Sequence, residues 1–101
     1  MPRFILHREG RFFEWGTISD SAISEPMGRA AFEARYRRKH GEEGMETLPD
    51  RLARALDHGT SCVDGTTFED MVAGNRMGEG ERELTLAEVD AWVRSFPVEE
   101  G

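Results

Sequence analysis

A two-residue turn between two alternating runs near the start of the chain constrains the fold more than any other feature. Glu9-Gly10 separates residues 3–8 from residues 11–18, and Gly10 can take the positive φ angle that such a turn requires. Because the turn fixes the register, we predict a β-hairpin over residues 3–18. Five cross-strand pairs are expected: Phe4 with Trp15, Ile5 with Glu14, Leu6 with Phe13, His7 with Phe12, and Arg8 with Arg11.

The register sorts the hairpin side chains onto two faces, one entirely apolar and one mixed. The apolar face carries Phe4, Leu6, Phe13 and Trp15, and the mixed face carries Ile5, His7, Phe12 and Glu14. A two-stranded hairpin is marginally stable at best in isolation. We therefore expect helices to pack against the apolar face.

Four short helices are predicted after the hairpin, over residues 29–40, 49–58, 67–74 and 86–96. Gly41 is expected to end the first helix, and Leu48-Pro49 to begin the second. The last helix has the clearest start, since Thr85 and Glu88 fit a capping box. Residues 19–28 and 74–83 have the composition of loops, and residues 60–63 could add a third strand at the hairpin edge.

A chain of 101 residues forms one domain. The predicted elements give residues 1–101 an α+β class: an N-terminal β-hairpin, with or without a third short strand, packed against about four short helices. A domain of this size has one small core and little room for an internal pocket. That excludes two-domain enzymes and doubly wound nucleotide-binding folds.

Charge is distributed unevenly along the chain. Residues 1–40 hold eight Lys/Arg against five Asp/Glu, whereas residues 41–101 hold five against fifteen. Much of the second excess lies in an acidic set, defined as Glu79, Glu81, Glu83, Glu88 and Asp90. In an extended segment, alternate glutamates would lie ~6.6–7 Å apart, close to the phosphate spacing of one DNA strand. The acidic set is therefore a candidate surface for a partner with a basic groove, and a solubilising rim is the simpler reading.

A basic stretch offers the opposite interpretation. Arg35, Arg38 and Lys39 point away from Phe32 and Tyr36 on the helix expected over residues 29–40. Cations on such an open face could contact nucleic-acid phosphates. The same residues also suit the negative end of a helix, which requires no ligand.

Catalytic and metal chemistry find little support in the sequence. Cys62 is the single cysteine, so an intrachain disulfide is excluded. The spacing of His58 and Cys62 could supply two zinc ligands, but the second pair of a structural site is missing. The acidic neighbours of Cys62 in sequence, such as Asp57 and Asp64, oppose a reactive thiolate. We expect no enzyme activity, no metal and no cofactor.

The chain has no long apolar segment, from which we expect a cytoplasmic protein with no membrane partner. In size, acidity and lack of a catalytic motif, it resembles short hypothetical proteins of phages and high-GC bacteria. Some of those inhibit host defence nucleases, anti-CRISPR proteins among them. The resemblance implies an inhibitor that binds a protein partner with a basic surface. The alternative is a nucleic-acid-associated factor that uses residues 29–40.

Overall fold

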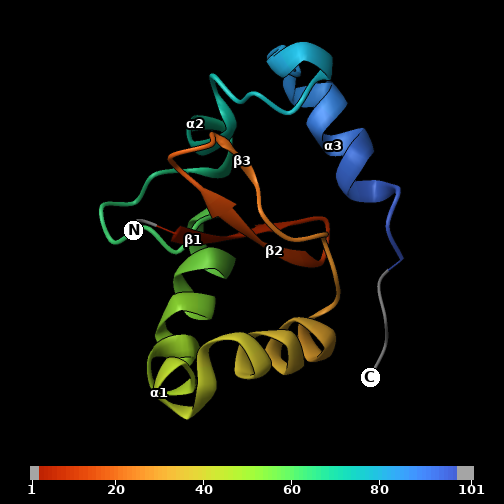
Figure 1. Cartoon of the computed structure of the whole chain (residues 1–101). Helices are drawn as coiled ribbons and strands as arrows, with labels where there is room; N and C mark the ends of the chain where they lie inside the picture. The colour runs from red at the N-terminus through yellow and green to blue at the C-terminus, as the bar shows by residue number, and fades with distance from the viewer. Residues whose placement is uncertain (1–2, 98–101) are drawn as a thin grey trace.

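The computed structural model describes residues 3–97 and places a small antiparallel sheet between two groups of helices (Figure 1). The sheet has the strand order β1-β2-β3, and α1 lies on the opposite side of it from α2 and α3. The elements are β1 (Arg3–Arg8), β2 (Arg11–Gly16), β3 (Ser21–Ala22), α1 (Arg29–His58), α2 (Phe68–Val72), the 3-10 turn η1 (Glu79–Glu81) and α3 (Leu86–Arg94). The α+β class is confirmed, with three α-helices in place of about four.

The predicted hairpin is confirmed in every pair. Leu6 lies opposite Phe13 and Arg8 opposite Arg11, and the intervening pairs follow the same register. Glu9 and Gly10 have φ angles of 56° and 75°, both positive, as a type I′ turn requires. The turn chemistry and the alternation of side chains therefore determine the same register.

The third strand comes from a segment that was predicted to be a loop. Ser21–Ala22 pairs with the end of β2, and the amide of Ile23 donates to the Glu14 carbonyl at 2.9 Å. At the other edge of the sheet, Thr60 makes only an isolated bridge to Leu6. The expected edge segment therefore touches β1 without forming a strand.

The long helix α1 corrects the prediction for residues 41–48. These residues are helical apart from Gly41, whose φ of 70° and ψ of −171° break the helix. We call residues 29–40 the first arm and residues 42–58 the second arm, and the two meet at a corner (Figure 1). Leu48-Pro49 therefore lies inside the second arm and does not begin it. Burial of Leu48 beside Leu52 explains how packing outweighs a proline there.

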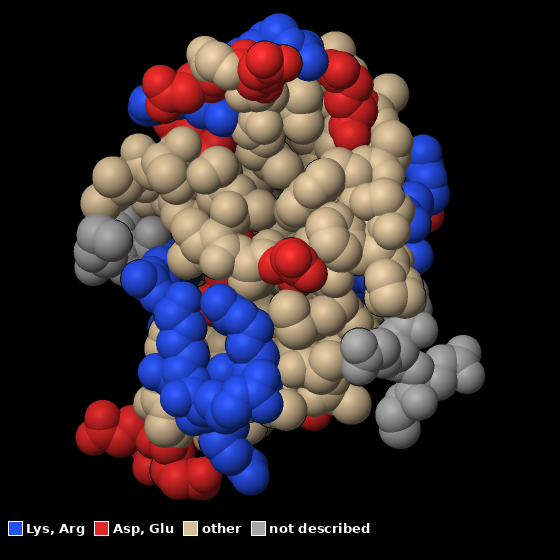
Figure 2. Space-filling model, turned by 45° about the vertical axis from the view of Figure 1, so that its right-hand side comes forward, with Lys and Arg blue, Asp and Glu red and all other residues tan. Residues whose placement is uncertain are grey.

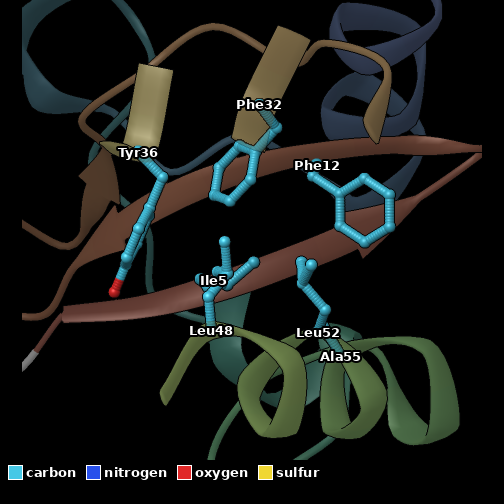
Figure 3. Packing of buried hydrophobic residues seen from close by; sticks show 7 residues of the cluster. All are labelled: Ile5, Phe12, Phe32, Tyr36, Leu48, Leu52 and Ala55. Atoms are coloured by element: carbon cyan, nitrogen blue, oxygen red, sulfur yellow. The ribbon is translucent and has the colours of Figure 1, made fainter. Parts of the chain in front are cut away.

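Helices cover both faces of the hairpin, whereas the sequence predicted cover on one. Both arms of α1 pack on the mixed face around Ile5 and Phe12 (Figure 3). The buried members of this first cluster are Ile5, Phe12, Phe32, Tyr36, Leu48, Leu52 and Ala55. Leu56, one turn after Leu52, is exposed.

The apolar face is covered by α2 and α3, as predicted. The buried members of this second cluster are Leu6, Phe13, Trp15, Phe68, Val72, Val89 and Val93. Thr67 caps α2 by accepting from the amide of Asp70, and the Thr85–Glu88 capping box of α3 is present in both directions. Across residues 3–97, no helix is both long enough and apolar enough to cross a membrane.

Candidate functional site

A buried carboxylate on the sheet organises the cations of the first arm. The side chain of Glu14 is only 3 % exposed and projects from β2 on the face that α1 covers. Arg35 donates to one carboxylate oxygen, and Lys39 Nζ lies 3.7 Å from the same oxygen. His40 Nε2 lies 3.2 Å from the other oxygen. Three neighbouring side chains of α1 are therefore anchored to one strand.

The surroundings of Glu14 keep it ionised. Burial raises its pKa, but hydrogen bonds from Arg35 and His40, together with the charges of Lys39 and Arg35, outweigh burial and lower the pKa below its usual value. The cluster carries more positive than negative charge, since Arg35 and Lys39 face one carboxylate. Arg35 and Lys39 also keep 24 % and 35 % of their side chains exposed. The cluster therefore adds positive potential to the surface outside it.

Arg29 and Arg37 of the first arm pair with Glu33 and Glu42, but four further cations of this region have no carboxylate partner among the described residues. Within residues 3–97, Arg3, Arg38 and Arg51 form no ion pair, and Arg54 Nε donates to the carbonyl of Ser61 at 2.8 Å. Arg38 shares a helix stripe with Arg35 and Lys39. We define the basic face as Arg3, Arg35, Arg38, Lys39, Arg51 and Arg54.

Two shallow depressions lie among three members of the basic face, Arg3, Arg51 and Arg54. Arg3 and Arg51 line one depression with His40, which also contacts Glu14, and line the other with Arg54. Figure 2 shows Lys and Arg side chains gathered in one patch low on the molecule, over α1. The three cations expected to contact phosphate, Arg35, Arg38 and Lys39, all lie on the first arm of α1, and Arg35 and Lys39 face Glu14.

The residues of the acidic set do not form one row, because most of them contact different partners within the fold. Asp90 accepts two hydrogen bonds from Arg8, at 2.8 and 3.1 Å, which join β1 to α3. Glu88 closes the capping box, and the Thr85 amide with Arg82 lowers its pKa. Glu83 accepts from the amide of Gly74 at 2.9 Å. Three of the five carboxylates thus have identifiable structural roles.

The remaining two acidic residues lie in η1. Glu79 and Glu81 are exposed, and Glu81 lies 3.8 Å from Arg76. The φ angles of Gly80 (68°) and Glu81 (64°) bend the segment sharply. Residues 79–81 are therefore not extended, and the phosphate-like spacing expected for an extended row does not apply to Glu79 and Glu81.

His58 and Cys62 meet through the backbone of Cys62. His58 Nε2 lies 2.9 Å from the carbonyl oxygen of Cys62, while the thiol donates to Asp64 at 2.9 Å. Hydrogen bonds from Cys62 and Thr66 lower the pKa of Asp64 to about 2. Within residues 3–97, no three His, Cys, Asp or Glu side chains converge in a way that could hold a metal ion.

Sequence reasoning missed Glu14 as an organiser and Arg3, Arg51 and Arg54 as members of the basic face. Glu14 is 21 residues from Arg35, and a local pattern carries no sign of such a contact. The sequence did carry one signal, because Glu14 lies between apolar residues on the mixed face of the hairpin. A carboxylate that is buried there needs cations as partners.

Comparison with known proteins adds no relative to this description. The chain matches no protein-family model, no curated protein and no solved structure.

Proposed function

We propose that the protein acts by binding and that its working surface is the basic face, which takes up a nucleic acid through its phosphates. One observation carries the proposal: of the six cations of the basic face only Arg35 and Lys39 have a carboxylate partner among the described residues, in a protein with 20 Asp/Glu and 13 Lys/Arg. With carboxylates in excess, cations placed without regard to a ligand would find acidic neighbours. Cations that lie close together on one face repel each other, and an anionic ligand bound between them removes this repulsion.

The dispersal of the acidic set supports the same choice. Asp90 accepts a hydrogen bond from Arg8, Glu88 caps α3, and Glu83 accepts from the amide of Gly74. These three carboxylates therefore stabilise the fold itself. The net charge of −7 repels nucleic acid at long range. Binding would then require one orientation, with the basic face turned to the phosphates. We place this activity in the cytoplasm and assign it no catalytic step.

Titration of a fluorescent nucleic acid, followed by anisotropy, tests the proposal. The variant Arg38→Gln/Lys39→Gln removes two exposed cations and leaves Arg35 on Glu14. We expect its affinity to fall about tenfold, because each lost phosphate contact weakens binding at all sequences. The slope of log affinity against log salt should fall by about 1 for each lost contact.

A matched control comes from the opposite end of the molecule, near η1. Arg76→Gln/Arg82→Gln changes the net charge equally, but these arginines pair with Asp20 and Glu88. We expect this control to bind like the wild type. Equal losses in the two variants would show that only net charge matters and would refute a role for the basic face.

A second candidate rests on Glu79 and Glu81, which remain exposed on η1. In this reading the protein is an inhibitor of the anti-CRISPR kind, whose acidic surface blocks the basic groove of a nucleic-acid-binding complex. Its test is the cleavage of DNA by a purified RNA-guided nuclease with the protein added. Inhibition that Glu79→Lys/Glu81→Lys abolishes, and that Arg38→Gln/Lys39→Gln spares, would favour this candidate over the first.

A further inference from the structure

Three arginines line one open depression beside the start of β1. The depression has a volume of about 290 Å³, near the lower end of the range of about 300–1,000 Å³ that small-ligand sites occupy. It is lined by Arg3 and Phe4 of β1, by Arg51 and Arg54 of α1, and by residues 61–63, which run beside β1 after α1 ends (Figure 1). Within the described part of the chain, no Asp or Glu lines it. We call it the arginine depression.

The fold brings these arginines together from two elements. The hairpin register places Arg3 on the same face of β1 as Ile5, which is the face that α1 covers. Arg51 and Arg54 are three residues apart on α1, so they lie on one side of this helix. All three arginines are half-buried. Salt therefore screens their charges less than it screens the charge of a fully exposed arginine.

Hydrogen bonds fix the walls of the arginine depression. The hydroxyl group of Ser61 accepts from the amide of Ile5, and the amide of Ser61 donates to the carbonyl of Ile5, both at 2.9 Å. Arg54 Nε donates to the Ser61 carbonyl at 2.8 Å, which leaves the two Nη groups of Arg54 for a ligand. A guanidinium that is already held in place loses less side-chain entropy when it binds an anion.

The three positive charges have no counter-charge within residues 3–97. None of the three arginines forms an ion pair there. Glu43 lines the neighbouring, larger depression but is not paired with them. Asp64, which follows the lining residues, accepts hydrogen bonds from the thiol of Cys62 and from the amide and hydroxyl group of Thr66. The arginine depression therefore suits a ligand that brings more than one negative charge into a small volume.

A phosphate monoester meets this requirement better than a phosphodiester does. Near pH 7 a monoester carries a charge of about −1.5 to −2 on three oxygens, and it has only one substituent. A phosphodiester inside a strand carries one negative charge, and the chain leaves it in two directions. Guanidinium groups match the geometry of phosphate oxygens. A group that ends a chain can enter a recessed site, whereas the interior of a strand passes over it.

We propose that the arginine depression binds a phosphate monoester, supplied by the terminal phosphate of a nucleic acid. The proposal rests on the proposed function and deepens it, because it assigns one part of the basic face to the end of the strand. Arg38 and Lys39, on the first arm, then contact phosphodiesters of the strand interior. A small phosphorylated molecule presents the same chemistry as a strand end, and the experiments below separate the two sources.

The first experiment compares three forms of one short oligonucleotide with an internal fluorescent label. One form carries a phosphate at both ends, the second carries the methyl ester of each phosphate, and the third has free hydroxyl ends. We expect the phosphate form to bind the wild type about tenfold more tightly than the other two, which is about the net contribution of one hydrogen bond to a charged group. The methyl ester keeps the phosphate but removes one charge and adds a second substituent.

Arg51→Gln and Arg38→Gln are a matched pair of variants on α1. Arg51→Gln removes a lining cation and should reduce the preference for terminal phosphate to less than about threefold. Arg38 is exposed and does not line the depression. Arg38→Gln should therefore weaken the binding of all three forms by the same factor and keep the tenfold preference. Circular dichroism checks that each variant is folded, and Arg3→Gln repeats the test on β1 if Arg51→Gln does not fold.

Cys62 provides a second measurement that needs no nucleic acid. It is the single cysteine of the chain and lines the arginine depression. Phenyl phosphate, a small monoester, should halve the rate at which neutral iodoacetamide alkylates Cys62 when its concentration equals its Kd. Methyl phenyl phosphate, the corresponding diester, should protect Cys62 less. Neither compound should protect Cys62 in Arg51→Gln.

The outcomes separate the two proposals. A tenfold preference that Arg51→Gln loses and Arg38→Gln keeps supports the arginine depression as the site of the strand end. Equal binding of the three forms overturns that assignment and leaves the basic face as a surface for phosphodiesters. If Cys62 is then still protected by phenyl phosphate, the ligand is a small phosphorylated molecule and not a strand end. If no form of the oligonucleotide binds the wild type, the proposed function fails as well.

Discussion

The buried Glu14 should make two variants of the same ion pair differ strongly in stability. Arg35→Met removes the cation and leaves the carboxylate, whose side chain is 3 % exposed. Glu14→Gln removes the carboxylate and leaves an arginine that is 24 % exposed and can turn towards water. Because only one partner is buried, we expect the loss of Arg35 to be the more damaging change.

The magnitudes follow from burial. Stranding a buried charge costs about 3–5 kcal/mol, and the lower end applies because Lys39 and His40 still face Glu14. Glu14→Gln should cost about 1 kcal/mol, since the amide can still accept a hydrogen bond from Arg35. The double variant Glu14→Gln/Arg35→Met has no buried charge, so it should be about 2 kcal/mol more stable than Arg35→Met alone.

Urea denaturation followed by the fluorescence of the buried Trp15 measures these differences. The pKa of Glu14 is lowered in the folded chain. Its ionised form therefore stabilises the fold above the unfolded-state pKa of about 4.3, and this stabilisation is lost as the pH falls through the lower folded value. The difference in the free energy of unfolding between the wild type and Arg35→Met should be largest near pH 7 and should become smaller in acid.

Two results would refute this reasoning. One is a Glu14→Gln variant that is as destabilised as Arg35→Met at neutral pH. The other is a double variant no more stable than Arg35→Met, which would show that Arg35 acts through packing and not through the buried charge.

Three further variants test the hairpin and the helix end in denaturant melts. Trp15→Ala should cost about 3–5 kcal/mol, because its ring is fully buried in the second cluster, and a loss below about 1 kcal/mol would contradict that burial. Gly10→Ala should cost about 1 kcal/mol, from its positive φ alone, since a Cβ there meets nothing within 4 Å. Gly59→Ala should cost clearly more, because a Cβ would lie 2.9 Å from the backbone nitrogen of Phe68, and equal losses at the two glycines would contradict the close packing.

Local chemistry made the hairpin and the caps predictable. Glu9-Gly10 and the alternation on either side agree on one register, and the Thr85–Glu88 box spans three residues. Each of these signals lies within a few residues of the structure that it determines. No tertiary contact is needed to select the register of the hairpin or the start of α3.

Contacts between residues far apart in the sequence determine two features that the sequence did not predict: the helical second arm and the helix that covers the mixed face. Residues 41–48 contain two glycines and precede Pro49, a composition that disfavours a helix. Burial of Leu48 against the hairpin overrides it. The mixed face looked half-exposed because Glu14 lies on it, and only the fold brings Arg35 and His40 to that carboxylate. The basic face depends on the same folding, since Arg3 and Arg51 are far apart in sequence.

The position of the hairpin between two clusters also sets an order of events during synthesis. The hairpin leaves the ribosome before the helices, and its partners on the two faces follow at different times. The first cluster is complete once Ala55 has emerged, whereas the second needs Val93, 38 residues later. At about 5–20 residues per second, a nascent chain spends seconds with one face of its sheet covered and the other bare. The apolar side chains of Leu6, Phe13 and Trp15 are then the surface that a chaperone would meet.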